Sequence, residues 1–86
     1  MTEDQKIIYQ KIDELLWSEW DPIGVNYVED ARDEYQSYTP KIFDLKINNA
    51  GKNIIAMSLY KIETDNIGLG GNMFRCQEIA DKIVSL

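Results

Sequence analysis

The chain has 86 residues, 44% of them hydrophobic, which suffices for one folded domain over residues 1–86. Its 15 acidic residues outweigh 9 basic ones, giving a net charge of −6. Because nucleic-acid affinity depends on clustered Lys and Arg, we expect no binding to nucleic acid or to an anionic membrane, whereas a protein partner with a basic surface fits this charge. Histidine is absent and Cys76 is the only cysteine, which excludes His-dependent catalytic triads, zinc sites built on His or several Cys, and an intrachain disulfide.

The sequence favours a reducing, aqueous compartment. A secreted domain of this size usually carries several cysteines, and no apolar run approaches the roughly 18 residues needed to cross a bilayer. The first residues are acidic and lack the basic and then apolar order of a signal peptide. We therefore predict a cytoplasmic protein.

The first element is predicted to be a helix over Glu3–Trp20. Thr2 and Gln5 have the spacing of a capping box, in which each side chain bonds to the backbone of the other residue. Pro22 ends the helix because it disfavours helical geometry at Asp21. The apolar residues that recur at helical spacing along this segment are Ile8, Ile12, Leu15 and Leu16, with Trp17 and Trp20 beside them.

An ordered turn is predicted next, over Asp21–Asp30. Asp21 can accept hydrogen bonds from backbone N–H groups two residues on, and Gly24 permits a backbone angle closed to other residues. The segment is too apolar for a loop surrounded by water, so we expect Ile23 and Val25 to pin it to the core. A short strand over residues 24–28 is an alternative, although no partner strand is evident.

The second helix is predicted over Ser37–Asn49. Pro40 suits the first turn of a helix rather than its interior, and Ser37 or Thr39 is the expected N-cap. An earlier start near Arg32, with a kink at Pro40, is the alternative.

The Ala50-Gly51 pair is expected to stop the second helix, and a third helix is predicted over Lys52–Asp65. The glycine-rich run Asn66–Gly71 then interrupts the helical pattern. A glycine run before a helix can hold a phosphate, but the Lys and the Ser or Thr of a phosphate-binding loop are missing. We therefore interpret this run as a turn between helices.

A fourth helix is predicted from Asn72, a good N-cap residue, to the end of the chain. Cys76 falls on the apolar face of this helix, which predicts a buried and unreactive thiol. Four helices around one core indicate an all-α bundle with an ordered Asp-Pro-Ile-Gly turn after the first helix.

Acidic and aromatic residues coincide in the segment from Trp17 to Pro40, here called the Trp17–Pro40 corner. Aromatic residues dominate interface hot spots, and neighbouring carboxylates suit a basic partner surface or a divalent cation. The opposing interpretation is that the rings fill the core while the acids, with Arg32 as a local counter-ion, solvate the surface. The candidate binding residues are Trp17, Trp20, Asp21, Glu29, Asp30, Asp33, Glu34, Tyr35 and Tyr38.

The same corner resembles a known group of proteins. The segment Leu15–Val25 reads Leu-Leu-Trp-Ser-Glu-Trp-Asp-Pro-Ile-Gly-Val, and Asp33–Pro40 reads Asp-Glu-Tyr-x-Ser-Tyr-x-Pro. This pattern is similar to that of the YugE-like family of small bacterial proteins. The resemblance implies a small helical cytosolic protein, and it brings no activity and no catalytic residue.

These features favour a protein-binding or regulatory module that acts through the Trp17–Pro40 corner, rather than an enzyme, and no cofactor is expected. Two alternatives stay open. One is an enzyme that uses carboxylates with a divalent metal ion, and the other is an acidic antidote protein that masks a basic toxin surface. A homodimer that buries a helix face is a further alternative.

Overall fold

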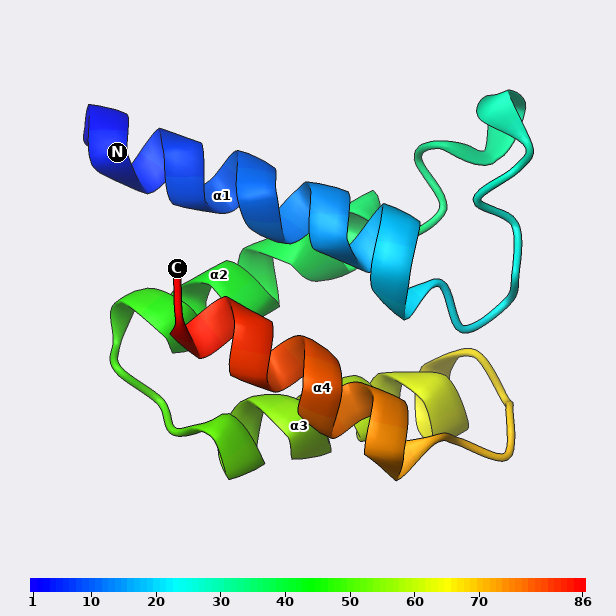
Figure 1. Cartoon of the computed structure of the whole chain (residues 1–86). Helices are drawn as coiled ribbons and strands as arrows, with labels where there is room; N and C mark the ends of the chain where they lie inside the picture. The colour runs from blue at the N-terminus through cyan, green and yellow to red at the C-terminus, as the bar shows by residue number, and fades with distance from the viewer.

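The computed structural model describes all residues from Met1 to Leu86 and contains helices and turns but no strand. The predicted all-α class is confirmed, and the alternative strand over residues 24–28 does not form. None of the helices is both long enough and apolar enough to span a membrane. The main helices (Figure 1) are α1 (Glu3–Leu15), α2 (Thr39–Ile47), α3 (Lys52–Lys61) and α4 (Met73–Val84), and the short π or 3-10 helices are η1 (Leu16–Trp20), η2 (Glu29–Ala31), η3 (Gln36–Tyr38) and η4 (Ile62–Asn66).

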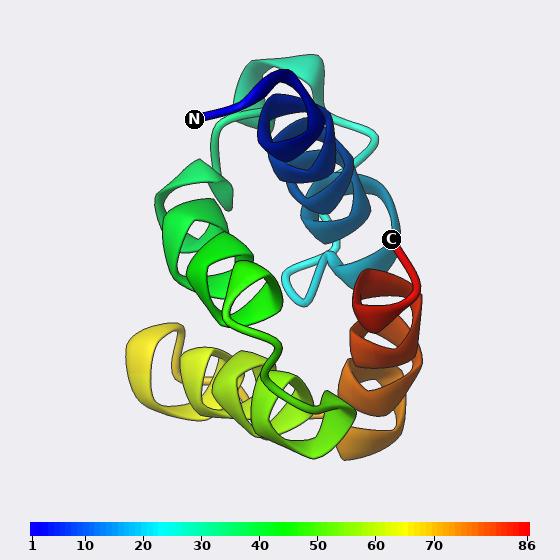
Figure 2. The same ribbon diagram turned by 90° about the vertical axis from the view of Figure 1, so that its left-hand side faces the viewer.

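The four α-helices surround a shared core. In Figure 2 they form the sides of a ring, with α4 lying between α1 and α3. The core consists of 15 buried hydrophobic residues, to which every α-helix contributes. Trp20 and Tyr35 are the largest side chains that are fully buried. Burial of these side chains supplies the main driving force of folding because it removes apolar surface from water.

α1 begins as the sequence predicts and ends in an unusual turn. The capping box forms, because Gln5 N–H donates to Thr2 Oγ1 at 3.1 Å and Thr2 N–H donates to Gln5 Oε1 at 3.0 Å. The chain continues as the π-helical turn η1 up to Trp20. Asp21 then leaves the helix in the left-handed region with a φ of 31°. The predicted helix over residues 3–20 is thus confirmed, with a wider last turn.

α2 starts differently from the prediction. Its N-cap is Tyr38, whose side chain makes no capping bond, so the predicted caps Ser37 and Thr39 are both wrong. Thr39 is instead buried, and its hydroxyl donates to Asp13 Oδ1 of α1 at 2.9 Å. This long-range bond occupies the side chain that capping would need. Pro40 lies in the first turn as predicted, and the alternative of a helix from near Arg32 with a kink at Pro40 does not form, because only the short 3-10 helix η3 lies between Arg32 and α2.

The connection from α2 to α3 also differs from the prediction. α2 ends at Ile47, and Asn49 takes the left-handed conformation with a φ of 60°. The predicted Ala50-Gly51 stop is therefore wrong, and Gly51 is the N-cap of α3. Asparagine can replace glycine at this position because its short polar side chain tolerates the left-handed region.

The third and fourth predicted helices are both present. α3 continues into η4, and together they cover the predicted Lys52–Asp65. Asn72 is the N-cap of α4, since its Oδ1 accepts a hydrogen bond from Arg75 N–H at 3.0 Å. α3 and α4 run alongside each other, as Figures 1 and 2 show, and their buried residues form one side of the core.

The corner departs most from what the sequence predicts. Val25 packs partly against the core, but Tyr27 is 84% exposed and Ile23 and Val28 are exposed as well. The prediction that the whole segment after α1 lies against the core is therefore wrong. Figure 1 shows this part of the chain extending away from the ends of α1 and α2. Tyr35, rather than the exposed segment, fills the core beside Trp20.

Gly71 lies where a side chain would force the Tyr60 ring to move. Its φ is 84°, and a Cβ atom there would lie 2.5 Å from Cε2 of Tyr60. Gly68 has the same φ of 84° with open space around it, so it is a matched control. We expect Gly71→Ala to lower the free energy of unfolding by about 3 kcal/mol and Gly68→Ala by about 1 kcal/mol, as measured by urea denaturation. Equal losses would contradict the steric role of Tyr60.

Candidate functional site

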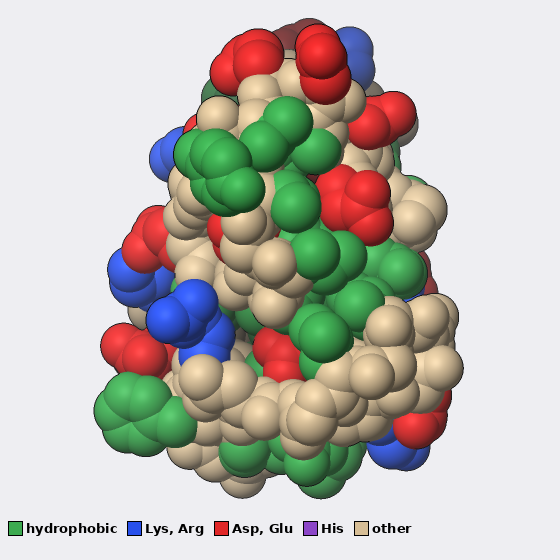
Figure 3. Space-filling model, turned by 90° about the vertical axis from the view of Figure 1, so that its right-hand side faces the viewer, with side chains coloured by type: hydrophobic (Ala, Val, Ile, Leu, Met, Phe, Trp, Pro, Cys, Tyr) green, Lys and Arg blue, Asp and Glu red, His purple; other side chains and the backbone are tan.

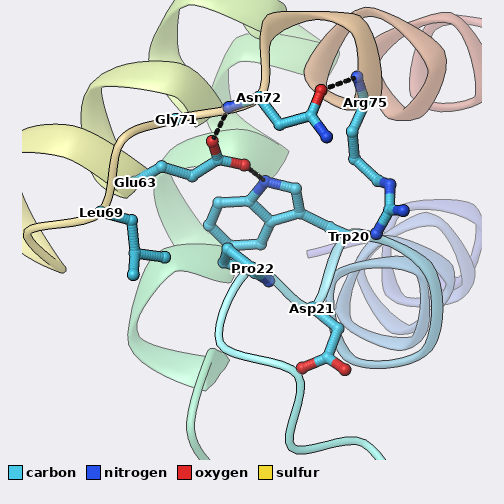
Figure 4. A pocket seen from close by; sticks show the side chains of 8 residues that line it. All are labelled: Trp20, Asp21, Pro22, Glu63, Leu69, Gly71, Asn72 and Arg75. Carbon is cyan, nitrogen blue, oxygen red and sulfur yellow. Dashed lines mark hydrogen bonds between the residues drawn. The ribbon is translucent and has the colours of Figure 1, made fainter.

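A buried carboxylate joins three segments of the chain. Glu63, in η4, is only 2% exposed. The indole N–H of Trp20 donates to Glu63 Oε1 at 2.8 Å, and the backbone N–H of Asn72 donates to Oε2 at 2.7 Å. The Cys76 thiol donates to Oε1 at 3.3 Å. Figure 4 shows the carboxylate between the indole and the start of α4. We call this arrangement the Glu63 junction.

The Glu63 junction explains the glycine-rich run before α4. The free N–H groups at the start of a helix attract an anion, and a phosphate-binding loop uses them for that purpose. Here the Glu63 carboxylate accepts the N–H of Asn72. The run Gly68–Gly71 thus brings the start of α4 onto an internal anion, which supports its interpretation as a turn between helices.

Glu63 is a residue that sequence reasoning did not select. The signal for it lies in the helical spacing of α3 and η4. Leu59 is buried, and Glu63 follows it by four residues on the same helical face. A carboxylate at a core position of an amphipathic helix requires hydrogen-bond donors from elsewhere in the fold.

A shallow pocket of about 210 Å³ opens over the Glu63 junction. Pro22 and Leu69 form its apolar rim, and Arg75 stands at its edge without an ion pair (Figure 4). The space-filling view of this side shows hydrophobic side chains gathered in a band beside a recess that holds a carboxylate (Figure 3). The band belongs to the side of the molecule where the connections after α1 and after η4 lie (Figure 1). Exposed Ile23, Val28 and Leu69 are in these connections.

The second polar centre of the corner is the Asp21 carboxylate. Its Oδ1 accepts hydrogen bonds from Val25 N–H at 2.9 Å and from the Tyr35 hydroxyl at 2.6 Å, and its Oδ2 accepts one from Asn26 N–H at 3.1 Å. The Tyr35 oxygen in turn accepts the N–H of Ile23 at 3.0 Å. These bonds fix the loop from Ile23 to Glu34, here called the corner loop, at its beginning.

This hydrogen-bonding differs in detail from the prediction. The predicted bond of the Asp21 side chain to an N–H group two residues on does not form. Its backbone partners lie four and five residues on, because the Tyr35 hydroxyl takes the nearer N–H group. The Tyr35 hydroxyl donates to Asp21 and the Trp20 indole donates to Glu63, so neither bonds to Asp33 or Glu34 of the corner loop. The predicted unusual backbone angle at Gly24 is confirmed by a φ of 77°.

The aromatic members of the predicted binding set belong mainly to the core. Trp17, Trp20 and Tyr35 are at most 7% exposed, and Tyr38 is half-buried. The rings of Trp20 and Tyr35 lie 5.4 Å apart between centroids, and Tyr38 packs edge-on against Trp20 at 6.2 Å. These rings therefore support the corner from beneath, and they are not its outer surface.

The acidic members of the set lie on the surface. Glu29 and Asp30 belong to η2, Asp33 and Glu34 follow it, and all four are exposed. No three Asp, Glu or Cys side chains of the chain are grouped so that they could hold a metal ion. The four acids thus lie exposed on the corner loop and do not form a metal centre.

Arg32 does not neutralise the acids of the corner loop, contrary to its predicted role as their counter-ion. Its guanidinium pairs with Asp13 at 3.0 Å and with Glu14 at 3.1 Å, both on α1. It also lies over the Trp17 ring, 5.4 Å from the centroid. Arg32 therefore ties the corner loop to α1 and leaves the loop acids without an ion pair of their own.

Two buried groups make the stability of this region depend on pH in the alkaline range. Burial and the hydrogen bond to Glu63 raise the pKa of the Cys76 thiol to about 12 from an ordinary value of 9.0. Burial and the hydrogen bond to Asp21 likewise raise the pKa of the Tyr35 hydroxyl. The unfolded chain releases these protons at lower pH than the folded chain does. Stability is therefore complete below about pH 9 and falls as the pH rises toward 12.

This dependence predicts a result for urea denaturation at about pH 8 and about pH 10.5. The free energy of unfolding should be lower at the higher pH, and Cys76→Ala and Tyr35→Phe should each reduce the difference. A pH dependence that both variants leave unchanged would contradict this assignment. The thiol of the folded chain should also react with iodoacetamide far more slowly than that of the unfolded chain, because it stays protonated and buried.

Comparison with known proteins identifies no relative. No family model, no curated protein and no solved structure matches the chain. The resemblance to the YugE-like family stays a prediction. The functional proposals therefore rest on the geometry of this chain.

Proposed function

We propose that the protein is a protein-binding module and that its corner loop binds a basic surface of another protein. The observation that carries this proposal is the exposure of Tyr27, whose side chain is 84% accessible. Exposed Val28 follows it directly, and Glu29 and Asp30 come next. An exposed tyrosine beside apolar and acidic side chains is a typical centre of a protein interface.

The corner loop is held by hydrogen bonds to Asp21, which precedes it, and to Tyr35, which follows it. The Asp21 carboxylate accepts hydrogen bonds from the backbone N–H groups of Val25 and Asn26, and the Tyr35 hydroxyl accepts one from that of Ile23. A loop that is fixed before binding loses less conformational entropy when it binds. The bonds at its base therefore support a role for the corner loop as a preformed surface.

The charge of the corner loop indicates which kind of partner it binds. Four exposed acids lie on the corner loop, and Arg32 pairs with α1 instead of with them. On a chain of net charge −6, this acidic surface favours a partner with exposed Lys and Arg. An antidote that masks a basic toxin is one protein of this kind. No grouping of side chains favours the metal-dependent enzyme.

Site-specific photo-crosslinking tests the proposal. A benzophenone amino acid replaces Tyr27 in one variant, and in the control variant it replaces Phe74, an aromatic residue of α4 that is 74% exposed. In cells that express the protein, we expect a discrete adduct at position 27 that position 74 does not give. The adduct should disappear when the four acids Glu29, Asp30, Asp33 and Glu34 are replaced with Ser or Asn.

The partner recovered in this way allows a second measurement. Its association with the purified protein should slow as the salt concentration rises, because the attraction of opposite charges is screened. Identical adducts at both positions, or an adduct that survives the loss of the acids, would refute the corner loop as the binding surface.

A further inference from the structure

A second surface, of opposite charge, lies between α2 and α3. In Figure 2 the two helices diverge from the short connection between them, like the arms of a V. A groove of about 390 Å³ lies between these arms. Its lining includes Leu45 of α2 and Ile54 and Met57 of α3. Ile54 is 58% exposed and Met57 is 45% exposed, so the floor of the groove is apolar and open to solvent.

The side chains that line the groove follow helical spacing. Lys41 and Leu45 are four residues apart on α2, and Ile54, Met57 and Lys61 lie at intervals of three and four on α3. Each helix therefore presents one row of side chains to the space between them. Two such rows form the kind of groove in which a third, amphipathic helix lays its apolar face. Methionine at its centre adapts to the shape of a partner.

Ser58 gives the groove an unused hydrogen-bonding group. Its side chain lines the groove, it is 9% exposed, and its hydroxyl is the only buried side-chain polar atom of the chain without a partner. Two other serines bond to the carbonyl four residues earlier: Ser18 of η1 donates to Glu14, and Ser85, the C-cap of α4, donates to Asp81. Ser58 makes no such bond. Buried polar groups of native proteins have hydrogen-bond partners, so this hydroxyl is available to a group that enters the groove.

The charge of the groove defines its occupant. Its ionisable residues are Lys41 and Lys61, and the side chain of neither makes an ion pair or a hydrogen bond within the chain. No acidic residue lines it. On a protein of net charge −6, this is a locally basic and apolar surface. We propose that the groove between α2 and α3 binds an amphipathic helix of a partner protein, with Asp or Glu flanking its apolar face.

This occupant fits better than the other candidates. Two lysines on an acidic chain are too few for a nucleic acid, whose binding depends on many phosphate contacts. The groove is open along its length, whereas a small-molecule site encloses most of its ligand. The proposal is independent of the corner loop, which is acidic and formed by other segments.

Selection from a display library of amphipathic helical peptides tests the proposal, because no partner needs to be known. The library varies the charged positions and keeps an apolar face at intervals of three and four residues. Wild-type protein is the target, and the Lys41→Glu/Lys61→Glu double variant is the counter-target. Peptides enriched on the wild type should carry Asp or Glu beside the apolar face. Their affinity for the double variant, measured by fluorescence anisotropy, should be at least about 10-fold weaker.

Two variants separate binding from folding. Lys11→Glu/Lys52→Glu makes the same change of charge at lysines that also lack an ion pair, and it should bind the selected peptides like the wild type. Ser58→Ala removes the unpaired hydroxyl, so it should raise Tm by about 4 °C and weaken the affinity for the selected peptides several-fold. If Ser58 served only the stability of the fold, its substitution would not raise Tm and weaken peptide binding together.

Three results would overturn the proposal. The first is a selection that enriches nothing on the wild type. The second is enrichment of peptides that bind the two double variants equally. The third is self-association of the free protein that only the Lys41→Glu/Lys61→Glu variant abolishes in sedimentation experiments, since the groove would then be an interface between two copies of this chain.

Discussion

Glu63→Gln is expected to lower the free energy of unfolding by about 3 kcal/mol. The carboxylate accepts hydrogen bonds from Trp20, Asn72 and Cys76 in a buried site. Glutamine has nearly the same shape but only one acceptor oxygen, so its amide N–H₂ would face one of the two N–H donors. The loss therefore combines a charge-assisted hydrogen bond with an unpaired buried donor. Urea denaturation at neutral pH measures it.

The matched control for this change is Glu78→Gln. Glu78 is exposed on α4 and makes no hydrogen bond or ion pair, so its substitution should change stability by less than about 0.5 kcal/mol. A cycle of Trp20→Phe, Glu63→Gln and the double variant then isolates the indole–carboxylate bond. We expect a coupling energy of at least about 1 kcal/mol. The role of the Glu63 junction is wrong if Glu63→Gln behaves like Glu78→Gln.

Asp21→Ala should release the beginning of the corner loop and lower the free energy of unfolding by about 3 kcal/mol. The substitution removes the acceptors of Val25 N–H, Asn26 N–H and the Tyr35 hydroxyl. It also places alanine at a left-handed φ of 31°, which aspartate tolerates better. Hydrogen–deuterium exchange provides a local measurement, because the amides of Val25 and Asn26 should lose their protection.

Asp33→Ala controls for the loss of one negative charge. Asp33 is exposed on the same loop, and its side chain makes no hydrogen bond. It should leave the exchange of Val25 and Asn26 unchanged. If the corner loop binds its partner as a preformed surface, Asp21→Ala should also weaken the crosslink at position 27, although the benzophenone amino acid itself is unchanged. Unchanged protection of both amides in Asp21→Ala would refute the proposed role of this carboxylate.

The elements that the sequence predicts correctly are those set by neighbours in the chain. The capping box of Thr2 and Gln5, the N-cap at Asn72 and the first-turn position of Pro40 each depend on residues within four positions of one another. The predicted N-cap of α2 is wrong because it depends on a residue far away in the chain. Thr39 could cap the helix, but it bonds to Asp13, 26 residues earlier in the chain. Local spacing carries no information about such a partner.

The candidate site shows the same limit. Trp20 and Glu63 are 43 residues apart, and only the packing of η1 against α4 and η4 brings them together. The sequence likewise does not show which aromatic side chains of the corner are buried and which are exposed. Tyr27 and Tyr35 occur in similar surroundings in the sequence, yet one is 84% exposed and the other is 2% exposed. The difference arises because the Tyr35 hydroxyl finds two partners at the edge of the core.

The two tryptophans give this protein a built-in spectroscopic probe. The Trp20 indole proton is held by a carboxylate in the interior, whereas the Trp17 indole makes no hydrogen bond within the chain and its ring faces the Arg32 guanidinium. The two indole N–H resonances should therefore be resolved in a nitrogen–proton spectrum, with that of Trp20 shifted downfield. The Trp20 resonance then reports on contact between η1 and η4, and the Trp17 resonance reports on contact between the corner loop and η1. Any partner or ligand that disturbs either contact becomes visible in a single spectrum, without added label.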